Sequence, residues 1–206
     1  MRSPNYDKYP ATRTEGALFY GWEAIREALD RERKGPLAVD WYAGVHEEEI
    51  TEGLLPGFSR IIRMRDLMKP EAEIRRMTDP FMTDDVLFGY VTNLRLPDYF
   101  CAEKIAAVRT ELETAGEDVL ILGAGAALVA PGHAVLAYAD MARWEIQQRF
   151  RRHEVCGLGV DNREDPVSIQ YKRGLFIDWR VWTIIKIHCS RAWTGGWTPT
   201  RPAIRR

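Results

Sequence analysis

Basic side chains gather in the second half of the chain in a pattern suited to phosphate. The segment ARWEIQQRFRR at 142–152 has helical spacing, which would place Arg143 and Arg151 about two turns apart on one face. Guanidinium forks match phosphate oxygens, and several that converge on one loop form a clamp. The alternative is a solvated helix in which Glu145 and Arg149 form an ordinary surface ion pair. The expected clamp would consist of Arg143, Arg149, Arg151, Arg152, Lys172 and Arg173.

A loop with two glycines is a second candidate site for phosphate. It follows the run VLIL at 119–122, which we expect to be a buried strand. Gly123 and Gly125 would let backbone N–H groups approach an anion, and a following helix N-terminus would add its partial positive charge. The same glycines also suit a tight turn between two strands. No G-x-x-x-x-G-K-[ST] motif occurs in the chain, so the sequence excludes a Walker A loop.

Two aspartates that end predicted strands are candidate acids. Asp40 and Asp140 each follow a short apolar run. In open parallel sheets, ligands bind beyond the carboxyl ends of the strands, where a carboxylate could accept a hydroxyl proton or hold a metal through water. Such residues also cap helices, and Asp140 directly precedes a predicted helix. Trp41 and Tyr42 beside Asp40 would also suit sugar recognition.

These candidates require a scaffold of alternating helices and strands. Helical patterns occur at 17–33, 46–55, 69–77, 99–115, 141–152 and 170–187, and strand-like runs occur at 37–40, 60–64, 119–122 and 134–139. The alternation predicts a three-layer α/β fold with a mostly parallel sheet flanked by helices. The order strand, Asp140, arginine-rich helix, polar loop and basic segment is similar to the lid region of nucleoside and nucleotide kinases. We therefore expect one P-loop-kinase-like domain over residues 1–189, without the Walker A loop.

The composition limits partners and location. Of 206 residues, 29 are Lys or Arg and 30 are Asp or Glu, which gives a net charge of -1 and argues against nucleic acid or an anionic membrane as a bulk partner. Cys101, Cys156 and Cys189 are widely separated and form no C-x-x-C pair. No apolar run approaches the ~20 residues of a membrane span. We expect a cytoplasmic protein that binds neither nucleic acid nor membrane.

Five long peptides carry a family resemblance: NYDKYP at 5–10, GWEAI at 21–25, YADMARWEIQQRFRR at 138–152, LGVDNREDP at 158–166 and YKRGLFIDWRV at 171–181. They resemble the N-terminal region of bacterial proteins of the class I mannose-6-phosphate isomerase family, over about residues 5–182. The resemblance implies a link to carbohydrate metabolism. It also implies that the isomerase is a cupin barrel placed after this region, with a zinc ion held by a Gln, two His and a Glu.

The ligands of that zinc ion have no counterpart in this chain. His46, His133, His153 and His188 are isolated, without an H-x-H, H-x-x-x-H or Q-x-H group. We therefore expect no cofactor in this chain and zinc only in the cupin part. Whether the chain is itself an enzyme stays open.

The last segment differs from the rest. Residues 190–206 read SRAWTGGWTPTRPAIRR, without the spacing of a helix or a strand. We interpret this irregular tail as the product of a shifted reading frame that truncates a longer protein before its cupin.

The sequence leaves three functions to compare. We expect an N-terminal, non-isomerase domain that binds a nucleotide or sugar phosphate. The first alternative is a regulatory or assembly domain without ligand, which packs on the cupin domain or associates with itself. The second is the isomerase itself, which only the family resemblance supports.

Overall fold

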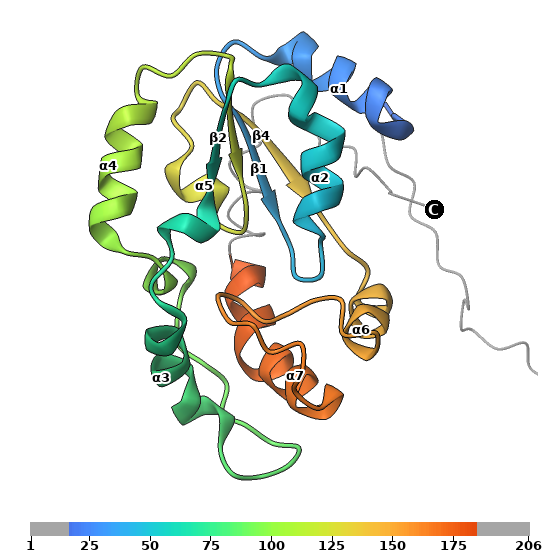
Figure 1. Ribbon diagram of the computed structural model, residues 1–206, viewed down its shortest axis with the longest axis vertical. Coiled ribbons are helices and arrows are strands. Elements are labelled where there is room, and N and C mark those ends of the chain that lie inside the picture. Colours follow the sequence, from blue (N-terminus) through green and yellow to red (C-terminus); the bar gives the residue numbers. More distant parts are fainter. Residues whose placement is uncertain (1–16, 185–206) are drawn as a thin grey trace, which may run out of the picture.

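Four parallel strands form the centre of the protein. The computed structural model describes residues 17–184. Its sheet contains β1 (Leu37–Trp41), β2 (Arg60–Arg63), β3 (Val119–Leu122) and β4 (Val135–Ala139) in the order β2-β3-β1-β4 (Figure 1). Each pair of neighbouring strands is parallel. Every predicted strand is therefore present.

Helices connect and flank the strands. They are α1 (Gly21–Glu32), α2 (Glu47–Leu54), α3 (Glu71–Met82), α4 (Ala102–Leu112), α5 (Ala126–Val129), α6 (Arg143–Arg151) and α7 (Val167–Arg173), with 3-10 turns at η1 (Leu55–Gly57), η2 (Met64–Leu67) and η3 (Leu96–Tyr99) and a π-helical turn at η4 (Gly174–Asp178). Within residues 17–184, none of them is long and apolar enough to cross a bilayer.

Several of these elements differ from the sequence prediction. The helix expected at 99–115 begins only at Ala102, because Phe100 is extended and forms an antiparallel bridge with Met68. Helix α3 continues past Met77 to Met82. Helix α5 has no helical period of its own, since four residues are too few to show one; the sequence offered it only as the helix that could follow the glycine loop.

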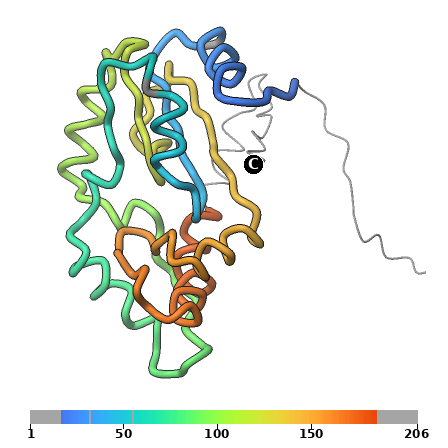
Figure 2. Tube along the Cα trace, turned by 45° about the vertical axis from the view of Figure 1, so that its right-hand side comes forward, coloured from blue at the N-terminus to red at the C-terminus, as the bar shows by residue number. Residues whose placement is uncertain are grey.

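The side chains of β1 alternate between two helical layers. Val39 lines a cavity together with Trp22 of α1 and Ile50 of α2. Asp40 instead bonds to the first turn of α5, on the opposite face of the sheet. Because α1 packs on α2 and α4 packs on α5, the layers are α1 with α2, the sheet, and α4 with α5 (Figures 1 and 2). The predicted three-layer α/β fold is confirmed.

The two central strands form the core of the sheet. Leu37 of β1 lies in register with Leu120 of β3 and with Val135 of β4. Strands β1 and β3 are buried along their whole length, which explains why β3 reads as a continuous apolar run and β1 as an apolar run broken only by Asp40. The β2 edge carries Arg60 and Arg63, charges that discourage pairing with another strand.

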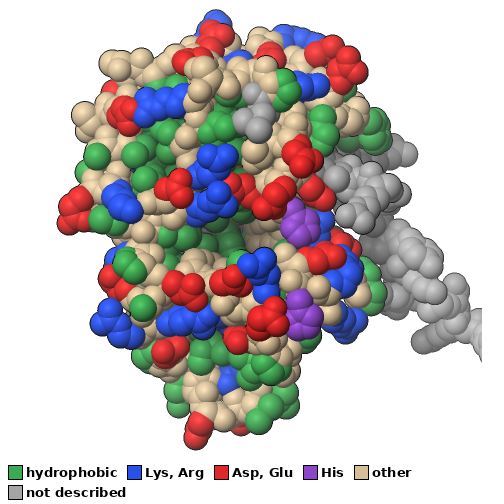
Figure 3. Space-filling view, viewed as in Figure 1, with side chains coloured by type: hydrophobic (Ala, Val, Ile, Leu, Met, Phe, Trp, Pro, Cys, Tyr) green, Lys and Arg blue, Asp and Glu red, His purple; other side chains and the backbone are tan. Residues whose placement is uncertain are grey.

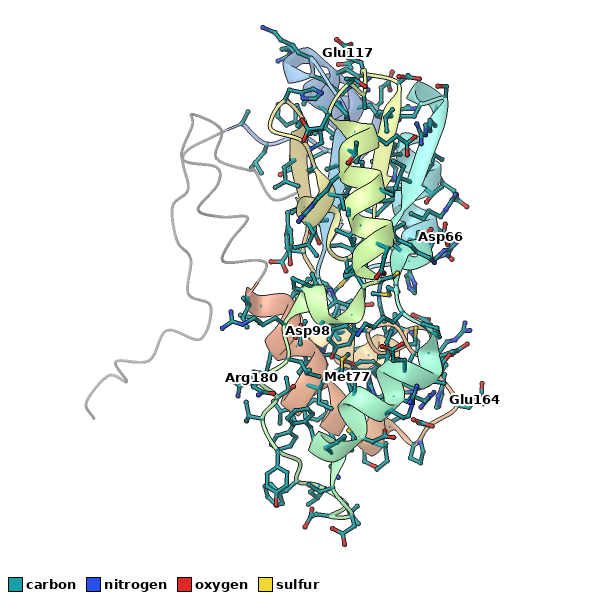
Figure 4. All side chains as sticks on the ribbon, turned by 90° about the vertical axis from the view of Figure 1, so that its left-hand side faces the viewer. Asp66, Met77, Asp98, Glu117, Glu164 and Arg180 are labelled. Carbon is teal, nitrogen blue, oxygen red and sulfur yellow. The ribbon has the colours of Figure 1, made fainter. Side chains whose placement is uncertain are left out.

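A second group of helices lies beyond the carboxyl ends of the strands. Figure 1 shows α3, α6 and α7 below the strand arrowheads, and we call this group the helical part. In Figure 4, Glu117 lies at the far end of the sheet, whereas Met77, Glu164 and Arg180 belong to the helical part. The strand ends therefore face the helical part.

Candidate functional site

The connections that follow the neighbouring strands β1 and β3 lead to opposite edges of the sheet. After β1 the chain passes through α2 on one face toward β2, and after β3 it passes through α5 on the other face toward β4 (Figure 1). Adjacent parallel strands that diverge in this way leave a crevice outside their carboxyl ends. That crevice is the usual ligand site of open α/β sheets.

A cleft of about 520 Å³ lies in this crevice. Trp41 and Tyr42 line it after β1, and Gly123 and Ala124 line it after β3. The opposite side belongs to the helical part and includes most of residues 156–165, which we call the wall loop. Figure 3 shows a furrow across the middle of this face, bordered by acidic and basic side chains.

Buried polar side chains fix the shape of the wall loop. The Asn162 side-chain oxygen accepts the Gly157 N–H at 2.7 Å, and Asp178 Oδ2 accepts the Leu158 N–H at 3.3 Å. Gln170 Nε2 donates to three carbonyl oxygens of the loop, at 2.7, 2.8 and 3.3 Å. The side chains that hold the loop are themselves buried. The cleft therefore has a wall that is organised before any ligand binds.

A buried ion pair lies directly behind the wall loop. Arg173 Nε donates to Asp178 Oδ2 at 3.1 Å, and its Nη1 donates to Thr78 of α3 at 3.1 Å. Burial raises the pKa of Asp178, although the Arg173 charge opposes this shift. A Cβ at position 157 would lie 2.7 Å from Asp178 Oδ2, so only glycine lets the loop pack this closely. The pair fastens the wall loop to α3 and α7.

Asp40 is a structural acid on the opposite face of the sheet from the α1–α2 layer. Its fully buried carboxylate accepts N–H groups from Gly125 at 3.0 Å, Ala127 at 3.1 Å and Trp41 at 2.8 Å. Burial raises the pKa of Asp40 to about 6, although these three bonds lower it. The carboxylate thus occupies the anion position at the first turn of α5.

Backbone N–H groups of the glycine loop bond to residues of β1, including Asp40. The Gly123 N–H donates to the Val39 carbonyl at 3.1 Å, and the Gly125 N–H donates to Asp40. Both glycines have a positive φ, of 132° and 92°, which other residues rarely adopt. In this conformation, the two N–H groups expected to meet phosphate bond to the protein, and Asp40 and the glycine loop form one unit.

One comparison identifies a family. A family model with the description "Domain of unknown function (DUF8485)" matches residues 21–194. The chain belongs to this family. No curated protein and no solved structure matches the chain. The matched region of DUF8485 includes the sheet, the cleft and the wall loop.

The arginine-rich helix of the DUF8485 domain does not form a clamp. Arg143 stacks on Trp179 with its Cζ 3.9 Å from the ring centroid, and it donates to the Tyr42 hydroxyl at 3.0 Å. Arg149 is buried and donates to the Gly44 carbonyl at 2.7 Å. Both side chains therefore brace the loop after β1 against the helical part.

The other predicted phosphate ligands lie elsewhere. Arg152 pairs at the surface with Glu145 at 3.0 Å and Glu154 at 2.7 Å. Arg151 lines a separate hollow, and the buried Lys172 donates to backbone carbonyls of the loop after α3. The six cations are thus divided among several places: Arg149 and Arg152 both contact Glu145, Arg151 and Lys172 line the separate hollow, and Arg143 and Arg173 have other partners. The structure does not bring these residues together at one site, because they lie on different faces of α6 and α7 and bond to protein groups there.

Asp140 and the histidines complete the predicted candidates. Asp140 accepts the N–H of Met141 at 3.0 Å, but the N-cap of α6 is Ala142. Of the two strand-end aspartates, it is therefore Asp40 that accepts N–H groups at the start of a helix, α5. Among residues 17–184, no group of three or more His, Cys, Asp or Glu side chains could hold a metal ion. His188 and the predicted tail, residues 190–206, lie outside the described residues.

Sequence reasoning missed the cations that line the cleft. Arg65 and Lys69 follow β2, and Arg163 belongs to the wall loop. The rule that ligands collect beyond strand ends, applied to the run at 60–64, could have identified the first two. No local pattern identifies Arg163, since its position depends on the packing of the wall loop against the sheet.

Proposed function

We propose that this domain binds a nucleotide or sugar phosphate in the cleft between β1 and β3, as the non-isomerase region of a mannose-6-phosphate isomerase family protein. The observation that carries the proposal is the position of the cleft, outside the carboxyl ends of two diverging parallel strands. Its volume of about 520 Å³ falls within the ~300–1,000 Å³ of small-molecule sites. The peptides described in the sequence analysis support the family link.

Three cations at the cleft could exchange their partners for phosphate. Arg65 lies 3.4 Å from Glu47, Lys69 lies 3.1 Å from Glu73, and Arg163 pairs at 2.5 Å with an aspartate of its own loop. The Arg163 pair is exposed on both sides and the other two are partly exposed; exposed pairs contribute only about 0–1 kcal/mol. A phosphate group that accepts several charge-assisted hydrogen bonds from these cations would compete with the carboxylates for them.

Aromatic side chains beside these cations suit the rest of such a ligand. Trp41, Tyr42 and Trp182 are largely buried and line the cleft with the small accessible part of their side chains, together with Gly157 and Gly159. Aromatic side chains can contact a base or a sugar, and glycines allow the backbone to approach closely. This combination favours a phosphorylated ligand with a flat or cyclic body over inorganic phosphate alone.

A thermal-shift screen tests the proposal. Purified chain would be titrated with ATP, ADP, a uridine nucleotide, mannose 6-phosphate and fructose 6-phosphate, with and without magnesium. At least one ligand should raise the melting temperature, and Arg65→Ala plus Lys69→Ala should remove the shift. The control is Arg31→Ala plus Arg76→Ala, which removes two exposed cations outside the cleft and should keep it. No shift with any ligand would contradict the proposal.

A second assay separates binding from isomerisation. In a coupled assay, zinc-supplemented chain should not interconvert mannose 6-phosphate and fructose 6-phosphate, because the cupin residues that hold zinc in the family have no counterpart here. Turnover above the background of zinc alone would show that the isomerase alternative is right.

We also propose a cytoplasmic location. Cys101 and Cys156 are free thiols, and free thiols persist in a reducing compartment. Fractionation of cells that express the tagged protein would check this, and recovery in an exported fraction would contradict it.

A further inference from the structure

The loop after α3 exposes a cluster of apolar side chains. Between α3 and η3 the chain projects from the lower end of the helical part (Figure 1), where Figure 3 shows hydrophobic side chains at the surface. Five of them are 57–69% exposed: Val86, Leu87, Phe88, Tyr90 and Val91. We call this cluster the tip. Exposed apolar patches of this kind usually mark a contact with another protein.

The tip has a fixed conformation. Asp85 Oδ1 accepts the N–H groups of Leu87 and Phe88, both at 2.7 Å. The Tyr90 N–H donates to a carbonyl of α3 at 2.8 Å, which closes the base of the loop. Lys172 of α7 is buried and donates to backbone carbonyls at the start of the loop. Because its backbone is already ordered, the tip loses little entropy when it binds a partner.

An apolar hollow lies beside the tip. It has a volume of about 440 Å³ and is bounded by Leu87 of the tip, Phe150 of α6, and side chains of α7 and η4. Tyr171 and Leu175 form part of its walls and are themselves exposed. The molecule therefore presents an apolar projection and an apolar hollow on the same surface.

The charges at these two features are complementary. The tip carries Asp84 and Asp85, and the N–H groups of Phe88 and Leu87 that bond to Asp85 hold the pKa of its carboxyl below the usual value. The rim of the hollow carries the exposed Arg151. The other cation there, Lys172, is occupied by the backbone of the tip loop. The acidic tip and the basic rim are complementary in charge. Within one molecule the tip already forms a wall of the hollow, so it cannot also fill that hollow.

We propose that this surface binds a second copy of the chain, with the tip of each copy inserted in the hollow of the other. Such an isologous pair follows from complementary features on one surface. Phe88 and Tyr90, each about two thirds exposed, together present on the order of 250 Å². With its three aliphatic neighbours and the walls of the hollow, each copy can approach the ~800 Å² per partner of a stable interface. The cleft residues Arg65 and Lys69 take no part in this contact.

Sedimentation velocity of the full chain, from 1 to about 200 μM, tests the proposal. A species of twice the chain mass should form. Phe88→Asp should weaken the dimer at least about tenfold, as expected for a central aromatic anchor. Trp144→Asp is the matched control, because Trp144 is 68% exposed but does not line the hollow, and it should leave the dimer unchanged. Circular dichroism would verify that both variants fold.

A charge swap separates the proposed docking from general adhesion. Asp84→Arg and Arg151→Asp should each weaken the dimer, because each places like charges at both contacts of the symmetric pair. The double variant should restore it. A chain that stays monomeric at all concentrations, a dimer that tolerates Phe88→Asp, or a double variant weaker than both single variants would overturn the proposal. Since the cleft is separate, failure here leaves the ligand screen unaffected.

Discussion

Replacing Asp40 by Asn should change how stability depends on pH. The folded protein raises the pKa of Asp40 from 3.8 to about 6, because burial disfavours the charged form. At about 1.36 kcal/mol for each pH unit between these values, ionisation of Asp40 costs the folded state about 3 kcal/mol in total. Since the raised pKa favours the protonated fold, this contribution is fully present below about pH 4 and is lost as the pH rises through 6.

Urea unfolding of both proteins at several pH values would measure this effect. From pH 4 to pH 8, the free energy of unfolding of the wild type should fall by about 2 kcal/mol relative to Asp40→Asn. Asparagine does not titrate, but it loses one of the two oxygens that accept N–H groups from Gly125 and Ala127, so the variant should be less stable at pH 4. Val39→Ala, a core change on the same strand, is the control and should lower stability equally at every pH. Parallel curves for the wild type and Asp40→Asn would refute the reasoning.

Three further changes test the wall loop and the groups that hold it. Arg173→Met should lower stability by about 3–5 kcal/mol, because it leaves Asp178 buried and unpaired, and adding Asp178→Leu should recover most of the loss in urea unfolding. A loss below about 1 kcal/mol would mean that the pair is not desolvated. Gly159→Ala should lower stability by about 1–3 kcal/mol, since φ is 69° there and a Cβ would lie 2.5 Å from Ile74; an unchanged melting temperature would contradict this. Gln170→Leu removes the donor to three carbonyls and should accelerate amide hydrogen exchange in the wall loop, whereas wild-type protection there would argue against its role.

The sequence predicted the sheet well because its strands carry their own signal. A central strand such as β3 is buried on both faces and therefore reads as an unbroken apolar run. The sequence also placed Asp40 and Gly123 near the ends of central strands, where the structure has them. What could not be predicted was which partner each would have, because Asp40 and Gly125 are 85 positions apart in the chain.

The arginine cluster shows what helical spacing alone could not predict. Arg149 of α6 and Arg152, its C-cap, both contact Glu145, but Arg149 is buried against the loop after β1 while Arg152 is exposed and also pairs with Glu154. The spacing of residues in a helix predicts the directions of their side chains around the helix axis. Where that axis lies in the molecule depends on packing against distant segments. The cleft cations Arg65 and Arg163 come from segments almost 100 residues apart and share no local pattern. Only the assembled fold brings them to one cleft.

Two adjacent residues of α7 connect the surfaces described above. Lys172 reaches outward to the backbone of the tip loop, and its neighbour Arg173 reaches inward to Asp178, which holds the Leu158 N–H in the cleft wall. A single turn of helix is therefore anchored at once to the tip, where we propose the dimer contact, and to the wall of the cleft, where we propose ligand binding. If pairing of two copies shifts this turn, occupancy of the pocket and pairing are thermodynamically linked, and each must alter the other's equilibrium by the same factor.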